Sequence, residues 1–494
     1  MFPTWRHMRL NTKTRRAARA MPVHRQQGRR LTLEVLEERT LPSFQPAVNY
    51  AIGPPSAPIS VASGDLRGNG ILDLVTDNIN THTVSVLLGN GDGTFQAPVE
   101  YHIDGNSWQD LALGDVNGNG KLDIVVAGST TSVLLGNGNG TFQPAITTRF
   151  GAALGQLADF KLADVNGDGN LDIVAVNSFG SQAVLSVALG NGDGTFRYPY
   201  SFNAPAFIPN SIAVGDFNSD GIPDVAIASR ETFFDPETGE HFTSGAVTIF
   251  PGTGGGLFGS PTVISTIPGA GSIAVGDFNG DGIADLLTVN TAFGNYSSIS
   301  VMLGNGDGTF RPPITTPAPQ IGLGPAVVAD FNGDGILDVA AVSATTNTVN
   351  VFLGNGDGTF QAPLSFAVDR NPTGLTVGDF NRDGFPDLAT ANFHTPGDVS
   401  VLINDTIWGT GPSSSWRNLA AAALSDLVPP AVTEPVVAAH SPWTSPTQTL
   451  DSSGTATVPL RQSFDPPRNE IQNQPWEFFA EGLCCSWQFP DLEI

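Results

Sequence analysis

Short apolar runs alternate with polar, glycine-rich turns through most of the chain. In the segment 111–146, apolar and β-branched residues form three runs, at 111–113, 123–127 and 132–135, and a fourth run contains Pro144. Each run has the length of a β-strand, and proline in a sheet is confined to edge strands. The intervening Asn-Gly-Asn-Gly turn supplies the positive φ angles that a tight hairpin needs. The pattern predicts four antiparallel strands with the proline-containing strand at an edge.

This unit occurs seven times, and each copy carries an acidic loop after its first strand. The loops begin at Asp65, Asp115, Asp164, Asp216, Asp277, Asp330 and Asp379, at intervals of 49 to 61 residues. A fixed period of this size marks a repeat architecture. No segment between residues 44 and 405 has helical periodicity. Seven units of four strands predict an all-β, seven-bladed β-propeller of four-stranded antiparallel blades, with an open linear solenoid as the alternative.

The two ends of the repeat region complement each other. Residues 44–50 match the fourth strand of a unit, whereas residues 399–403 match the third. We expect the N-terminal strand to complete the last blade, so that pairing of the N- and C-terminal strands closes the ring and removes an exposed sheet edge. The propeller then spans residues 44–405. Residues 406–494 are rich in Pro, Ser and Ala, which predicts a largely disordered tail.

Residues 1–43 form a basic leader without the apolar core of an ordinary secretory signal. Residues 36–41, Leu-Glu-Glu-Arg-Thr-Leu, resemble the Leu-Glu-Pro-Arg-x-Leu-Leu sorting motif of bacterial envelope and secreted proteins, with Glu38 and Pro42 departing from it. We therefore expect an export or sorting segment, and a protein of the extracellular space or cell envelope of a bacterium. A plain basic tail is the alternative.

The charge balance excludes one class of partner. Ten of the 22 basic residues and three of the 47 acidic residues precede Phe44, so the remainder carries a net charge of −32. A body this acidic is repelled by a phosphate backbone, so we expect no nucleic-acid binding. No apolar stretch is long enough for a transmembrane span, and the two cysteines, Cys484 and Cys485, are adjacent and form no disulfide framework.

The acidic loops have the chemistry of a site for a hard cation. Oxygen-bearing residues occupy loop positions 1, 3, 5 and 9, with glycine at position 6, and calcium prefers such oxygen ligands. Five loops have three carboxylates and one amide: Asp164, Asn166, Asp168 and Asp172; Asp216, Asn218, Asp220 and Asp224; Asp277, Asn279, Asp281 and Asp285; Asp330, Asn332, Asp334 and Asp338; Asp379, Asn381, Asp383 and Asp387. Magnesium fits less well because it demands octahedral geometry, and a metal-free turn is the other alternative.

Two loops depart from this set. The second has Asp115, Asn117, Asn119 and Asp123, which is one carboxylate fewer, so we expect weaker binding. The first has Asp65, Asn69 and Asp73 but Arg67 at position 3. A guanidinium cannot bind a cation, so this site is doubtful, and Arg67 is expected to pair with Asp65 or Asp73. The prediction is about five to seven calcium ions.

The loop sequence Gly-Asp-Phe-Asn-Gly-Asp-Gly-x-x-Asp, followed by Leu-Gly-Asn-Gly-Asp-Gly-Thr-Phe, resembles the FG-GAP/VCBS repeat of integrin α-chains and bacterial surface proteins. The resemblance covers residues 44–405. It implies a backbone carbonyl ligand at loop position 7 and a partner at the rim opposite the loops. Aromatic residues expected there, either as a binding patch or buried, are Trp108, Phe233, Phe234, His241, Phe242, Phe293 and Tyr296. The downstream Asn-Gly-Asp-Gly segments are interpreted as hairpin turns.

We expect a monomeric, calcium-binding recognition or adhesion module of the cell surface, with a protein or carbohydrate ligand. A structural component of a surface layer is the alternative. A propeller enzyme, such as a lyase or hydrolase, is less favoured because catalysis needs a convergent set of acids, bases or nucleophiles. The few candidates in the ring form no recognisable motif: His82, His102, His241, His394, Lys121 and Lys161.

Overall fold

The computed structural model describes residues 44–404, except 105–109, 129, 151–153, 155, 180–181, 206–207, 235–240, 267–268, 293–295 and 320–321. The chain divides into two compact units, Met1–Ala439 and His440–Ile494. The second unit, the predicted leader 1–43 and the predicted tail 406–494 lie outside the described residues. Among the described residues there is no helix long and apolar enough to cross a membrane.

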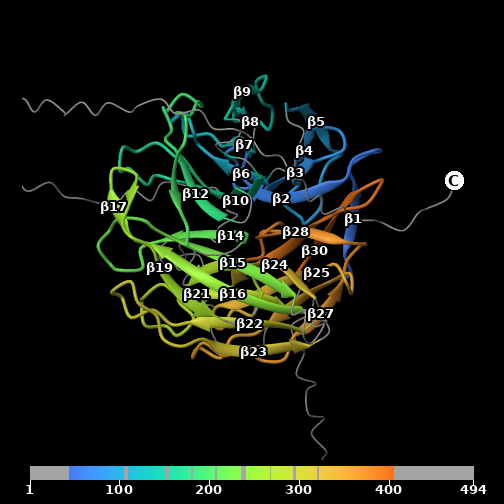
Figure 1. Ribbon diagram of the computed structural model, residues 1–494. Coiled ribbons are helices and arrows are strands. Elements are labelled where there is room, and N and C mark those ends of the chain that lie inside the picture. Colours follow the sequence, from blue (N-terminus) through green and yellow to red (C-terminus); the bar gives the residue numbers. More distant parts are fainter. Residues whose placement is uncertain are drawn as a thin grey trace, which may run out of the picture. The chain divides into compact units, whose positions relative to one another are not determined.

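Seven four-stranded antiparallel sheets form the blades of a β-propeller (Figure 1). The first three are β2 (Pro58–Gly64), β3 (Asp73–Asn78), β4 (Thr83–Leu87) and β5 (Val99–His102); β6 (Asp110–Gly114), β7 (Asp123–Ala127), β8 (Thr130–Leu134) and β9 (Ile146–Arg149); and β10 (Gln156–Ala163), β11 (Asp172–Phe179), β12 (Gln182–Ala188) and β13 (Tyr200–Asn203). The predicted all-β fold is confirmed.

The fourth, fifth and sixth blades follow the same strand order. They are β14 (Ile208–Gly215), β15 (Asp224–Phe234), β16 (His241–Phe250) and β19 (Thr262–Thr266); β20 (Ala270–Gly276), β21 (Asp285–Ala292), β22 (Tyr296–Met302) and β23 (Ile314–Pro319); and β24 (Leu323–Ala329), β25 (Asp338–Ser343), β26 (Thr348–Phe352) and β27 (Leu364–Ala367). A small hairpin, β17 (Gly252–Gly254) and β18 (Leu257–Phe258), lies within the fourth blade's last turn.

The seventh blade closes the ring with strands from both ends of the repeat region. Its order is β1 (Val48–Ala51), β30 (Asp398–Leu402), β29 (Asp387–Asn392) and β28 (Pro372–Gly378). Strand β1 pairs antiparallel with β30, from Val48 opposite Val401 to Ala51 opposite Asp398. The first strands of the first and seventh blades, β2 and β28, are in contact. The predicted closure by terminal strand pairing is confirmed, and the solenoid alternative is excluded.

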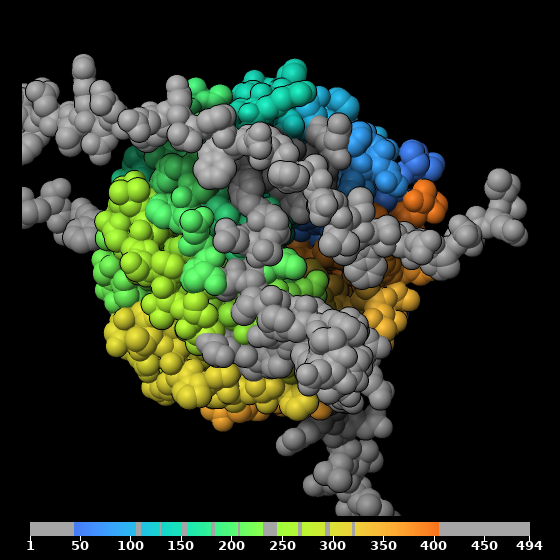
Figure 2. All heavy atoms as spheres, in the orientation of Figure 1, coloured from blue at the N-terminus to red at the C-terminus, as the bar shows by residue number. Residues whose placement is uncertain are grey.

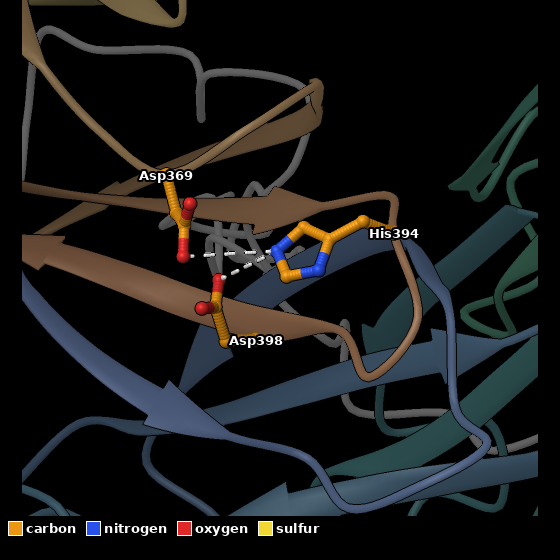
Figure 3. Close-up of side chains that lie close together, drawn as sticks. All are labelled: Asp369, His394 and Asp398. Carbon is orange, nitrogen blue, oxygen red and sulfur yellow. Dashed lines mark ion pairs between the residues drawn. The ribbon is translucent and has the colours of Figure 1, made fainter.

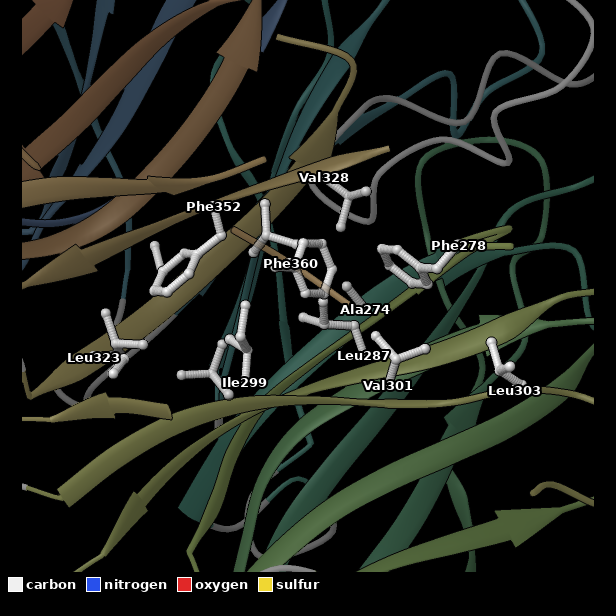
Figure 4. Packing of buried hydrophobic residues seen from close by; sticks show 14 residues of the cluster. Ala274, Phe278, Leu287, Ile299, Val301, Leu303, Leu323, Val328, Phe352 and Phe360 are labelled. Carbon is white, nitrogen blue, oxygen red and sulfur yellow. The ribbon is translucent and has the colours of Figure 1, made fainter. Parts of the chain in front are cut away.

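The hydrophobic core lies between blades. Each of seven buried clusters joins residues of two consecutive blades, because both faces of a blade's inner strands are covered by a neighbour. Figure 4 shows the cluster between the fifth and sixth blades, where Ile299 and Val301 pack with Val328 and Phe352. In Figure 2 the sequence colours follow one another from blade to blade, and the orange seventh blade adjoins the blue first.

Candidate metal centres

The acidic loops connect the first and second strands of each blade, so they all lie at one rim of the ring. In the third loop, the Asp164 carboxylate accepts hydrogen bonds from the backbone N–H groups of Gly167 (2.7 Å), Asp168 (3.2 Å) and Gly169 (2.8 Å). Positive φ angles at Gly167 and Gly169 permit this tight path. The chain thus curls around its position-1 carboxylate and brings the remaining ligand positions to the same side.

The aspartate at position 9 is the buried floor of every loop. These seven residues are 0–1% exposed: Asp73, Asp123, Asp172, Asp224, Asp285, Asp338 and Asp387. The Asp172 carboxylate accepts hydrogen bonds from Val165 N–H (3.1 Å) and from Gly190 N–H (2.8 Å). Because Gly190 belongs to the turn between the third and fourth strands, this one carboxylate connects both turns at its rim of the blade.

Burial raises the pKa of the position-9 carboxyls, and in the second to seventh loops neighbouring acidic groups of the same loop raise it further. The pKa reaches about 6 in Asp123, Asp172 and Asp285, about 7 in Asp387 and about 8 in Asp338. In the third to seventh loops, the aspartates at positions 1 and 5 both contribute to this rise. Three mutually repelling carboxylates therefore share each of these loops, and a bound cation relieves that repulsion.

In the part of the chain that the structure describes, no acidic loop brings three of its carboxylates to within 4.8 Å of one another. Ca–O distances are about 2.3–2.6 Å, so ligand oxygens on opposite sides of calcium lie about 5 Å apart. Among the described residues, the group of three acidic or imidazole side chains whose ligand atoms all lie within 4.8 Å is Asp369, His394 and Asp398, which is not in an acidic loop. Some loop oxygens, such as Asp164 Oδ1, already accept two backbone N–H bonds, whereas Asp164 Oδ2 and Asp172 Oδ2 accept one each and retain a further lone pair for a cation.

Arg67 supplies the positive charge in the first loop. Its Nη2 lies 2.6 Å from Asp73 Oδ1 and donates to the Gly89 carbonyl at 2.6 Å. Asp65 instead accepts the Arg67 backbone N–H, at 3.2 Å. The sequence predicted that the guanidinium pairs with Asp65 or Asp73, and in the structure it pairs with Asp73. The guanidinium thus places a positive charge next to the buried Asp73 carboxylate.

The second loop differs at its third ligand position. Asn119 Oδ1 accepts the Lys121 backbone N–H at 2.9 Å, as Asp168 Oδ1 accepts that of Asn170 in the third loop. The amide therefore preserves the loop's backbone path but not its charge. Only Asp115 adds to the rise in the Asp123 pKa. The predicted order of affinity, with the second loop weaker, stays a prediction.

The predicted aromatic loops of the opposite rim need a correction. Phe233 and Phe234 belong to β15, where they pair with Phe242 and His241 of β16. The insertion of the fourth unit thus lengthens a hairpin, because the antiparallel register continues from Arg230 opposite Gly245 to Phe234 opposite His241. Tyr296 likewise begins β22. Trp108 and Phe293 lie outside the described residues, as do the side chains of the other five aromatic candidates, so the binding patch stays a prediction.

The sequence reasoning missed a cavity on the ring axis that is lined by both apolar and charged residues. The cavity has a volume of about 550 Å³ and is lined mainly by the first strands of the blades. Asp159 bridges two blades, since it pairs with Lys161 Nζ at 2.9 Å and accepts a hydrogen bond from Ser211 Oγ at 2.8 Å. Burial raises the pKa of Asp110, at the same cavity, to about 6. A signal of this cavity was present in the sequence. Asp110 and Asp159 are charged residues inside first strands, where other units have small or apolar residues.

The glycine turns between third and fourth strands, predicted as hairpin turns, also connect neighbouring blades. In the first blade, Asp92 Oδ1 accepts bonds from its own turn at Thr94, and Gly93 N–H donates to Phe380 of the seventh acidic loop. The Gly308 and Gly358 N–H groups donate in the same way to the preceding blade's loop. The interpretation as turns is confirmed, and their glycines additionally fix the acidic loops of the adjacent blades.

Comparison with known proteins agrees with this repeat. A family described as FG-GAP-like repeat matches residues 78–126, 115–175, 164–227, 241–288, 289–341 and 330–390, more than half of the chain. The FG-GAP repeat matches residues 209–250. No curated protein sequence matches the chain significantly.

The chain is distantly similar to solved structures. The V. cholerae biofilm matrix protein Bap1 is 12% identical, with a TM-score of 0.41, over 74% of this chain and 92% of its own. Virginiamycin B lyase from Staphylococcus aureus is 13% identical, with a TM-score of 0.46, over 73% and 99%. The family assignment therefore rests on the repeats, which recur in register through all seven blades. The chain belongs to the FG-GAP-like repeat family.

Proposed function

We propose that the chain is a calcium-stabilised recognition or adhesion module that works outside the cell or at the cell envelope. The main supporting observation is the buried carboxylate at position 9. In five of the seven blades, two further carboxylates of the same loop lie near enough to raise its pKa. Such a cluster is unfavourable without a counter-charge. Extracellular modules typically bind calcium with Kd of about 10⁻⁴–10⁻³ M, which matches a calcium-rich exterior.

The proposed ligands follow the loop positions. In each full loop the side-chain oxygens at positions 1, 3, 5 and 9 would bind the ion, with the backbone carbonyl at position 7 as a further ligand. The position-7 residues are Asn170, Ile222, Ile283, Ile336 and Phe385. We propose five sites of this kind, a weaker sixth in the second loop, and none in the first, where Arg67 already neutralises Asp73.

We further propose that the ring binds a partner rather than catalysing a reaction. Two acidic groups at the axial cavity are engaged in bonds between blades, Asp159 with Ser211 and Asp110 with Ser60. Loops at the rim opposite the acidic loops vary most in length, and loops on a rigid scaffold commonly carry binding residues. The proposed module is a monomer that binds a protein or carbohydrate ligand. The alternative is a structural component of a surface layer.

Thermal unfolding of the full chain tests the calcium proposal. The melting temperature is compared in EGTA, in calcium and in magnesium. Each filled site contributes RT ln(1 + [L]/Kd), about 2.7 kcal/mol at a hundredfold excess over Kd, so several sites should raise the melting temperature strongly and calcium-selectively. An equal curve in EGTA and calcium would contradict the proposal.

Glycan and protein arrays probed with the calcium-loaded chain then test recognition. Binding that disappears in EGTA supports the module. Concentration-dependent growth of large particles in light scattering, with no array ligand, would favour the surface-layer alternative.

A further inference from the structure

A second cluster of metal-ligating side chains lies in the seventh blade, away from its acidic loop. Asp369 lies between β27 and β28, His394 lies in the turn between β29 and β30, and Asp398 begins β30. His394 Nε2 is 3.7 Å from Asp369 Oδ2 and 3.6 Å from Asp398 Oδ1 (Figure 3). Both connections are at the end of the blade opposite the acidic loop, so the cluster is separate from the loop sites.

Within the part of the chain that the structure describes, neither ring nitrogen of His394 has a hydrogen-bond partner, and neither is accessible to solvent. Its contacts with the two carboxylates are longer than hydrogen bonds. They are close to the separation of neighbouring ligands around a small cation, because metal–ligand distances of about 2.0–2.2 Å place tetrahedral ligands about 3.3–3.6 Å apart. The Asp369 and Asp398 carboxyls are also hydrogen-bonded to each other, and the three ligand atoms all lie within 4.8 Å of one another, which is close enough for them to share one small ion.

Further residues orient both carboxylates. Asn392 Nδ2 donates to Asp398 Oδ1 at 2.7 Å, and the Arg370 backbone N–H donates to Asp369 Oδ1 at 2.7 Å. Asn49 of the closing strand β1 donates to Asp369 Oδ2 at 3.3 Å. Such outer hydrogen bonds fix the direction of ligand groups in metal sites. Through Asn49, the cluster also contacts the strand that closes the ring.

The equivalent position carries a hydroxyl in the first, fifth and sixth blades and an apolar residue in the third and fourth. Asp398 pairs with Asn392 as Thr83 pairs with Asn78 in the first blade and Thr348 with Ser343 in the sixth. Thr83 accepts a hydrogen bond from Asn78 Nδ2 at 3.2 Å, which is the bond that Asp398 accepts from Asn392. The hairpin therefore forms with threonine here, and the carboxylate of Asp398 is not required by the fold.

We propose that Asp369, His394 and Asp398 bind one divalent transition-metal ion of the zinc class. Imidazole and carboxylate ligands favour such an ion, whereas the all-oxygen acidic loops favour calcium. Three protein ligands leave at least one coordination position for water or for a donor group of a partner. The site is particular to the seventh blade and does not depend on the proposed function of the acidic loops.

Zinc titration of the calcium-saturated full chain, followed by calorimetry, tests this proposal. Wild type is compared with Asp398→Thr, which restores the residue of the first and sixth blades, and with His394→Asn. The matched control is His102→Asn, because His102 is exposed and lies 3.9 Å from a single carboxylate, that of Asp104. We expect wild type and the control to bind one more zinc ion per chain than the two cluster variants, with affinity at this site reduced at least about 100-fold in the variants.

Cobalt(II) provides a second measurement, because its visible absorption bands report coordination geometry. Wild type and His102→Asn should show bands that Asp398→Thr and His394→Asn lack. Melting curves in calcium without zinc establish that each variant folds, and either cluster variant suffices if the other does not fold. Equal zinc stoichiometry and equal cobalt spectra in all four chains would overturn the proposal and leave the cluster as an ion pair.

Discussion

At the scale of single residues, the first acidic loop illustrates what the other loops require. Arg67 lies 2.6 Å from Asp73, which is fully buried, and its guanidinium also reaches the Gly89 carbonyl. The positive charge of the Arg67 side chain thus lies next to the buried carboxylate at position 9 of the loop. The neighbouring blades repeat that buried carboxylate without any basic side chain at position 3. This contrast makes the charge of the loops testable one residue at a time.

Arg67→Asn should exchange the internal cation for calcium. In EGTA the variant leaves the Asp73 carboxylate buried and unpaired, so we expect a loss of about 3–5 kcal/mol in the free energy of unfolding. In calcium most of that loss should be recovered, because the loop then has the ligand set of the second loop. Urea unfolding with and without calcium measures the recovery, and calorimetry should show one additional calcium ion.

Arg382→Asn is the control for this prediction. Arg382 is an exposed residue at a non-ligand position of the seventh loop, with a φ of 64° that asparagine adopts readily, so its replacement should neither lower the stability nor add a calcium ion. An unchanged calcium stoichiometry in a folded Arg67→Asn chain would contradict the assignment of position 3.

At the scale of elements, the acidic loop and the glycine turn between the third and fourth strands are connected by hydrogen bonds and form one unit. Gly190 N–H donates to Asp172 within the third blade, while Gly194 N–H donates to the Val116 carbonyl in the second blade's loop. At the ring seam Asn404 performs both tasks, since its backbone N–H donates to Asp387 and its side chain donates to the Phe331 carbonyl at 2.8 Å. The seam therefore reproduces the contacts of the other blades with a different residue.

Gly190→Ala should uncouple the two turns of the third blade. An added Cβ would overlap the Leu171 carbonyl oxygen, so the backbone must shift and the bond to Asp172 is lost. We expect about 1–3 kcal/mol lower stability in urea unfolding and weaker calcium binding at this loop. Gly271→Ala is the matched control, because a Cβ there meets only ordinary contacts, the nearest at 3.4 Å. Equal losses in both variants would refute the coupling.

Sequence predicted those features that local patterns determine. Strand lengths, turn glycines and the matching segments at residues 44–50 and 399–403 recur in register, so the blades and the closure followed from them. The hydrogen bonds between blades depend on the orientation of one blade relative to the next. The sequence pattern of a single repeat does not indicate that orientation. Asp369 and His394 are 25 residues apart in different connections, and no motif joins them. The strand extension to Phe234 was missed because its sequence resembles an ordinary polar insertion.

At the scale of the whole molecule, buried acidic groups recur around the ring rather than at one site. Besides the position-9 carboxyls, burial raises the pKa of Asp77 to about 8 and that of Asp110 to about 6. All of these shifts have the same sign. Their effects on folding therefore add, and the ring as a whole should respond to pH in one direction when no calcium is present.

The free energy of unfolding of the calcium-free chain should fall as pH rises from about 4 to about 8. In this window the folded chain binds more protons than the unfolded chain, because the folded pKa is raised above the ordinary value of 3.8, to about 6 in Asp172, about 7 in Asp387 and about 8 in Asp338. Stability then decreases with pH, since its slope follows the difference in bound protons between the unfolded and folded states.

Calcium should reverse this dependence. Binding requires deprotonated carboxylates and releases protons, so calcium affinity rises over the same pH range. Urea unfolding at a series of pH values, in EGTA and in excess calcium, should give two curves that diverge as pH rises, with the calcium curve above. Stability in EGTA that increases with pH would show that the buried carboxyls are already ionised without calcium. The acidic loops would then need no counter-ion, which would remove the physical basis for calcium-dependent stability of the ring.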